Sequence, residues 1–183
     1  MKSVNFNDHF LGFEEDEDIL LDTNIIYAFL NPFDAWHTTI KNLFNTHILT
    51  SNVKLYLYTH SSIVNEVTYL SRDPLNNYSK HYGTIFSEQD ITQSVNDILD
   101  KTKQLIEQDV VLLLESNKES IYQQVDYAMY FGAMDSLIIS LVNEYGISLL
   151  TTDTRLLNNL TSKQNEFPNI RNVYYTNGYH RSY

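Results

Sequence analysis

Ile19-Leu20-Leu21-Asp22 is a short apolar run that ends in an aspartate. Such a run is typical of a strand buried on both faces, as strands are in a parallel sheet. The stretch Leu149-Leu150-Thr151-Thr152-Asp153 has the same form. Ligands of open parallel sheets bind at the carboxyl ends of the strands, so Asp22 and Asp153 are candidate functional residues. The plain alternative for each aspartate is a helix N-cap.

The other predicted elements alternate between strands and helices. Further strands are predicted at 54–58, 110–114, 147–151 and 172–176, and helices at 24–30, 34–44, 62–70, 88–107, 118–130, 133–145 and 154–160. Residues 71–86, which contain Pro74 and Gly83, are expected to form a loop, and Asp34 is expected to cap the second helix. This alternation predicts an α/β fold with a central, mainly parallel sheet.

The chain of 183 residues shows no internal repeat and no change of composition that would mark a linker. We therefore expect one domain over residues 18–183. Residues 1–17 are expected to be an irregular lead-in that ends in acidic residues, and residues 71–108 to be a helical insertion.

Composition excludes several classes of protein. A hydrophobic content of 43% excludes a disordered chain, and the absence of cysteine excludes disulfides and cysteine-based zinc sites. The longest apolar run has six residues, Ile25 to Leu30, far fewer than the roughly 20 that span a bilayer. The six histidines lack paired ligand spacing, and five glycines form no phosphate-binding loop. We expect a cytoplasmic protein without a membrane partner.

The net charge of −11 argues, taken alone, against a nucleic-acid partner. A site for divalent cations would weaken this objection, because bound ions offset part of the acidic charge. Two further acids have unusual neighbours: Glu66 lies in a predicted helix between Val64 and Val67, and Asp135 opens a strongly apolar helix. Their plain alternatives are a solvated helix flank for Glu66 and a helix-dipole interaction for Asp135.

Four segments together resemble the PIN-domain nucleases, and most of all the compact VapC-type toxin ribonucleases. They are Asp22-Thr23-Asn24, Glu66, the segment 132–138 around Asp135, and Leu150-Thr151-Thr152-Asp153. The resemblance extends over about residues 18 to 176. It implies a three-layer α/β/α fold in which Asp22, Glu66, Asp135 and Asp153 converge on one pocket that holds Mg²⁺ or Mn²⁺. The lead-in and residues 71–108 are additional to the compact toxins.

The activity that this resemblance implies is metal-dependent endoribonucleolytic cleavage of RNA by metal-activated water. Asp22 and Asp135 are then the main metal ligands, completed by Glu66 and Asp153. The neighbouring polar residues that would orient the carboxylates or contact phosphate are Thr23, Asn24, Thr151 and Arg155. The partners that it implies are an RNA substrate, an antitoxin protein and a second copy of the chain.

Two alternatives remain open from the sequence. One is a catalytically inactive PIN-like module that binds RNA or protein. The other is an unrelated α/β phosphotransfer or hydrolase domain with Asp22 as nucleophile, although Asn24 stands where such enzymes place a second aspartate. His60 is expected to cap a helix or pack in the core, with substrate contact as the alternative. The aromatic tail residues Tyr174, Tyr175, Tyr179 and Tyr183 suit either packing or base stacking.

Overall fold

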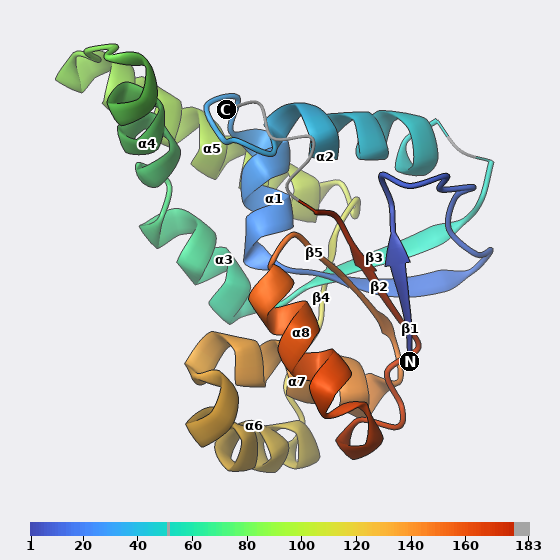
Figure 1. The fold of residues 1–183 in the computed structure, drawn as a ribbon. Coiled ribbons are helices and arrows are strands. Elements are labelled where there is room, and N and C mark those ends of the chain that lie inside the picture. Colours follow the sequence, from blue (N-terminus) through green and yellow to red (C-terminus); the bar gives the residue numbers. More distant parts are fainter. Residues whose placement is uncertain (51, 178–183) are drawn as a thin grey trace.

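The computed structural model, which describes residues 1–50 and 52–177, contains a six-stranded sheet in which every neighbouring pair is parallel (Figure 1). The strand order is β1-β6-β5-β2-β3-β4. The strands are β1 (Lys2–Asn5), β2 (Glu17–Leu21), β3 (Leu55–Thr59), β4 (Leu112–Leu113), β5 (Ser148–Thr151) and β6 (Asn172–Tyr175).

Helices cover both faces of this sheet, with α1 and α2 on one side and α7 and α8 on the other (Figure 1). The α-helices of the described residues are α1 (Thr23–Leu30), α2 (His37–Leu43), α3 (Ser61–Tyr69), α4 (Asp73–Tyr82), α5 (Glu88–Glu107), α6 (Lys118–Phe131), α7 (Ala133–Tyr145) and α8 (Thr154–Ser162). A π-helix (Phe44–Ile48) and a 3₁₀ helix (Gln164–Glu166) complete them. The predicted three-layer α/β/α fold is confirmed.

Strand β2 occupies the centre of the sheet, as its apolar run predicted. Ile19, Leu20 and Leu21 are all at most 1% exposed, because β3 and β5 pair with β2 on its two edges and helices cover its faces. After β2 the chain first adds β3 and β4 on one side, and it later adds β5 and β6 on the other. The strand order therefore reverses next to β2, which is where open α/β sheets bind ligands.

The prediction that residues 1–17 are irregular is wrong for their first part. Lys2–Asn5 form β1, which pairs in parallel with β6 at the edge of the sheet. The segment is short and mostly polar, so it carries no apolar signal of its own. Its partner strand lies about 170 residues further along the chain, and a pairing at that sequence separation leaves no local pattern.

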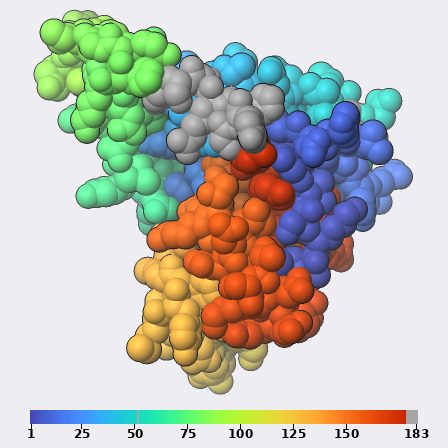
Figure 2. All heavy atoms as spheres, viewed as in Figure 1, coloured from blue at the N-terminus to red at the C-terminus, as the bar shows by residue number. Residues whose placement is uncertain are grey.

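The predicted loop at 71–86 is also wrong, because Asp73–Tyr82 form helix α4. Pro74 stands in the first turn of the helix, where proline is favoured, and Gly83 ends it with a φ of +67°. The proline and glycine that suggested a loop thus mark the start and end of a helix. In Figures 1 and 2, α4 and the adjoining part of α5 project from the body of the molecule.

Two smaller predictions also differ from the structure. Asp34 does not cap α2, which begins at His37; its Oδ1 atom instead accepts a hydrogen bond from the backbone N–H of Trp36 (2.7 Å) in the preceding turn. Tyr174 is 3% exposed and packs edge-on against Phe13, which excludes a base-stacking role for its ring. Tyr179 and Tyr183 lie outside the described residues.

Within residues 1–50 and 52–177, none of the helices combines the length and the apolar character needed to cross a bilayer.

Candidate functional site

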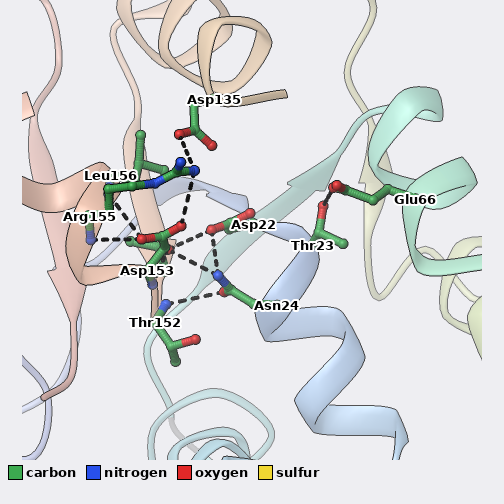
Figure 3. Close-up of polar contacts among 10 residues, drawn as sticks. Asp22, Thr23, Asn24, Glu66, Asp135, Thr152, Asp153, Arg155 and Leu156 are labelled. Carbon is green, nitrogen blue, oxygen red and sulfur yellow. Dashed lines mark hydrogen bonds and ion pairs between the residues drawn. The ribbon is translucent and has the colours of Figure 1, made fainter. Parts of the chain in front are cut away.

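A cavity of about 390 Å³ lies where β2 and β5 end. All four acids singled out in the sequence, Asp22, Glu66, Asp135 and Asp153, line it, and they come from four different elements. Asp22 follows β2, Glu66 lies on α3, Asp135 is in the first turn of α7, and Asp153 precedes α8 (Figure 3). The fold therefore brings together side chains that are spread over 130 residues of sequence.

Asp22 is the most buried of these acids, with 5% exposure. Its Oδ2 atom accepts hydrogen bonds from the Thr151 hydroxyl (2.5 Å) and from the Asn24 side-chain amide (2.9 Å). Burial raises the pKa of Asp22 to about 7; the hydrogen bond from Thr151 opposes this shift, and the nearby charges of Asp153 and Asp135 add to it. Asp22 stands at the N-cap position of α1, but its side chain makes no capping hydrogen bond.

Asp153, in contrast, is a true helix N-cap. Its Oδ1 atom accepts hydrogen bonds from the backbone N–H groups of Arg155 (2.7 Å) and Leu156 (3.0 Å) at the start of α8. Its own N–H donates to the Thr151 hydroxyl (2.9 Å). The cap holds the carboxylate in one orientation, and its second oxygen, Oδ2, lies 3.9 Å from the guanidinium of Arg155.

Arg155 joins two of the four acids. Its Nη2 atom donates to Asp135 Oδ2 at 3.0 Å and lies 3.9 Å from Asp153 Oδ2 (Figure 3). The Asp135 side chain is 13% exposed. Burial raises the pKa of Asp135, the charge of Arg155 opposes this, and Asp153 and Glu66 add to it. Arg155 is thus the cation that partly offsets the charge of these carboxylates.

Glu66 lies on the other side of the group, next to Thr23 (Figure 3). The Thr23 hydroxyl, which is buried at the start of α1, donates to Glu66 Oε2 at 2.5 Å. Helix α3 buries Ile63 and Val67 against the core, and this packing leaves Glu66 half-buried on the flank that borders the cavity. The solvated-flank alternative for Glu66 therefore does not describe its environment.

Asn24 connects the two strand ends. Its Oδ1 atom accepts a hydrogen bond from the N–H of Thr152 (3.1 Å), while its amide donates to Asp22. Together with the Thr151 hydroxyl, Asn24 holds the buried Asp22 carboxylate between β2 and β5.

No protein-family model matches the sequence, and no curated protein matches it. Among solved structures, VapC20 of Mycobacterium tuberculosis, a sarcin–ricin loop cleaving toxin, superimposes with a TM-score of 0.53 over 76% of this chain and 93% of its own, at 16% identity. The chain has a PIN-domain fold. FitAB bound to an IR36 DNA fragment also superimposes on this chain, at 19% identity over 85% of this chain and 94% of its own, with a TM-score of 0.48. FitAcB of Neisseria gonorrhoeae does so as well, at 19% identity over 88% of this chain and 99% of its own, with a TM-score of 0.44.

The PIN-domain fold implies a divalent metal ion, and the four acids fit such an ion by their chemistry. They supply carboxylate oxygens, the donors that Mg²⁺ and Mn²⁺ prefer. Asp22 is buried and makes no ion pair within the described residues, so a cation beside it would offset a costly charge. Within those same residues, however, no three acidic or histidine side chains are gathered closely enough around one point to hold an ion in the present arrangement.

Three of the acidic and amide residues that line the cavity were not predicted as site residues from the sequence: Asp34, Asp73 and Asn77. Asp73 and Asn77 belong to α4, which was predicted to be a loop, and Asp34 was predicted to cap a helix. No local pattern marks these residues, because their place beside the cavity depends on how the segments that carry them pack in the folded chain.

His60 and Ser116 form a hydrogen-bonded pair, but His60 is not oriented to act as a base that activates Ser116 as a nucleophile. His60 Nδ1 accepts the backbone N–H of Ser62 (3.1 Å) and thereby caps α3, as predicted. The proton of a neutral ring is then on Nε2, which donates to the Ser116 hydroxyl (3.1 Å) and cannot accept its proton. Partial burial lowers the pKa of His60 and so favours the neutral ring.

Proposed function

We propose that this protein is a metal-dependent endoribonuclease that hydrolyses RNA phosphodiester bonds. The observation that carries the proposal is the convergence of Asp22, Glu66, Asp135 and Asp153 on one cavity at the reversal point of a parallel sheet. The likeness to VapC20, a cleaving toxin, supports a nuclease within the shared fold.

In this proposal Asp22 and Asp135 hold the ion, and Glu66 and Asp153 complete its surroundings. An Mg²⁺ or Mn²⁺ ion held by these residues would supply polarisation of the phosphodiester and a water molecule of lowered pKa for hydrolysis. Thr151 and Asn24 hold the Asp22 carboxylate through the hydrogen bonds described above. Hydrolysis of this kind needs no nucleophilic side chain, in agreement with the orientation of the His60–Ser116 pair.

The test is cleavage of a labelled single-stranded RNA by the purified protein, in Mg²⁺ or Mn²⁺ and with a chelator. We expect cleavage that stops with the chelator and is restored by added metal. Asp22→Asn and Asp135→Asn should each abolish cleavage while the circular dichroism spectrum is retained. Asp126→Asn, at an exposed acid on α6 outside the cavity, is the matched control and should cleave normally. Cleavage by the Asp22→Asn variant at the wild-type rate would contradict the proposal.

We further propose that the protein is the toxin of a toxin–antitoxin pair and that an antitoxin protein restrains it. The support is the similarity to VapC20, which is a toxin. Growth arrest on induced expression in a bacterial host, absent for Asp22→Asn, is the expected result. Normal growth with abundant, active protein would favour an RNA-processing role instead.

The competing function is a non-catalytic PIN-like module that binds RNA or protein. It is favoured by the spacing of the acids, since no three of them surround one point in the described residues. A titration with Mn²⁺ distinguishes the two functions. A ribonuclease is expected to bind Mn²⁺ with an affinity that depends on Asp22, whereas a binding module is expected to show no such Asp22-dependent binding.

A further inference from the structure

We propose that Arg155 competes with the divalent cation for Asp135 and Asp153, so that the ion binds only as the guanidinium leaves them. The inference rests on the proposed metal-dependent function and adds an internal competitor to it. Arg155 then acts as a positioning residue that holds the two carboxylates until an ion replaces it.

The guanidinium of Arg155 faces one oxygen of each of the two carboxylates. Both helix-capping hydrogen bonds fall on Asp153 Oδ1, so the oxygen left for a cation is Oδ2, and this atom faces the guanidinium. Asp135 likewise uses Oδ2 to accept from Arg155, and its side chain is only 13% exposed. A cation that binds both Asp135 Oδ2 and Asp153 Oδ2 therefore needs the position that Arg155 now holds.

The side chains that line the cavity carry an excess of negative charge. Arg155 is the one basic side chain among the described residues that line the cavity, together with six acidic ones: Asp22, Asp34, Glu66, Asp73, Asp135 and Asp153. A divalent ion offsets more of this negative charge than one guanidinium does, so the cavity favours the exchange.

Arg155 can leave the two carboxylates at a small cost in free energy. Its side chain is 71% exposed, and exposed ion pairs are weak and are screened by salt. Little packing is lost when the arginine leaves, because most of its side chain is already exposed to solvent. Asp135 and Asp153 each direct one carboxylate oxygen toward Arg155, and among the described residues no three acids surround one point.

The experiment measures the affinity for Mn²⁺ alone, without RNA, by calorimetric titration of the chelator-treated and dialysed protein. Arg155→Met keeps the length of the side chain and removes its charge, so we expect the dissociation constant for Mn²⁺ to fall about fivefold, the effect of an ion pair worth about 1 kcal/mol. The control Arg171→Met, at an exposed arginine outside the cavity, changes the net charge equally and should bind Mn²⁺ like the wild type. Arg155→Gln is a second neutral variant and should bind like Arg155→Met.

A second measurement follows the melting temperature with and without Mn²⁺. The metal-induced increase should be larger for Arg155→Met than for the wild type, and the metal-free melting temperature should be lower. Unchanged or weaker Mn²⁺ binding by both neutral variants overturns the inference, as does a failure of all the proteins to bind Mn²⁺. The proposed function is judged separately, by RNA cleavage. If the protein cleaves RNA but neither neutral variant binds Mn²⁺ more tightly than the wild type does, only the proposed competition is disproved.

Discussion

The Asp22→Asn variant should gain stability relative to the wild type as the pH rises from acidic to alkaline values. Asp22 is 5% exposed, and its pKa is raised from 3.8 to about 7, so the folded state keeps a proton that the unfolded chain has already released. Where the folded state binds more protons, stability falls as the pH rises, and for Asp22 this loss accumulates between about pH 4 and pH 7. Asparagine does not titrate and is free of the loss.

The size of the effect follows from these two pKa values. A pKa difference of about 3 units corresponds to about 4 kcal/mol of destabilisation once Asp22 is fully ionised. Less than half of this is already present at pH 5, so the larger part, on the order of 2–3 kcal/mol, develops between pH 5 and pH 8. The amide group of asparagine also replaces an acceptor by a donor, but that cost is the same at both pH values and cancels in the difference.

The assay is urea unfolding of the wild type and Asp22→Asn at pH 5 and pH 8, with a chelator present throughout. The variant should gain on the order of 2–3 kcal/mol relative to the wild type on going from pH 5 to pH 8. Asp126→Asn, at an exposed acid, should show no such gain. A difference of zero, or a loss for Asp22→Asn at pH 8, would refute the reasoning that burial makes the Asp22 charge costly. A variant that is both more stable and inactive would show that the site is maintained at the expense of stability.

Three further outcomes follow from particular contacts. Glu17→Ala should lower the free energy of unfolding, measured by urea denaturation, by about 3 kcal/mol or more. The Glu17 carboxylate is 3% exposed and accepts hydrogen bonds from the side chains of Tyr174 (2.6 Å), Ser148 and Asn172, all of which would lose this acceptor. His60→Ala should cost about 1 kcal/mol through the lost cap of α3, while RNA cleavage and its pH profile stay unchanged; a hundredfold loss of cleavage would contradict this. Thr151→Val removes a hydrogen bond that favours ionised Asp22, so the pH midpoint of Mn²⁺ binding should move upward in calorimetric titrations; a downward move would contradict it.

The core of the fold was predictable because its signals are local. Three aliphatic residues in a row at 19–21, followed by an aspartate, are typical of a central strand of a covered sheet, and the structure places them there. Helix α5 and helix α7 begin and end at the predicted residues, since Ser87 caps the first and Gly146 ends the second. The edge strand β1 lacked such a signal, because the strand with which it pairs, β6, lies about 170 residues further along the chain.

Part of the candidate site was predictable by the same reasoning. Neighbouring parallel strands end at the same edge of a sheet, so Asp22 and Asp153 were expected to meet, and they line one cavity. Asp73 and Asn77 were not predicted, because the proline and glycine that frame α4 were interpreted as loop residues. The metal, the RNA substrate and the roles of the four acids remain predictions for the experiments above.

The sequence by itself determined the alternation of strands and helices, the buried central strands and the acids at their ends, because short-range patterns of apolar residues and capping groups encode these features. Only the tertiary structure decided that Asp153 caps a helix while Asp22 does not, that the pKa of Asp22 is raised to about 7, and that Arg155 lies between Asp135 and Asp153. Burial and charge interactions depend on distances through space, and positions along the chain do not specify those distances until the chain has folded.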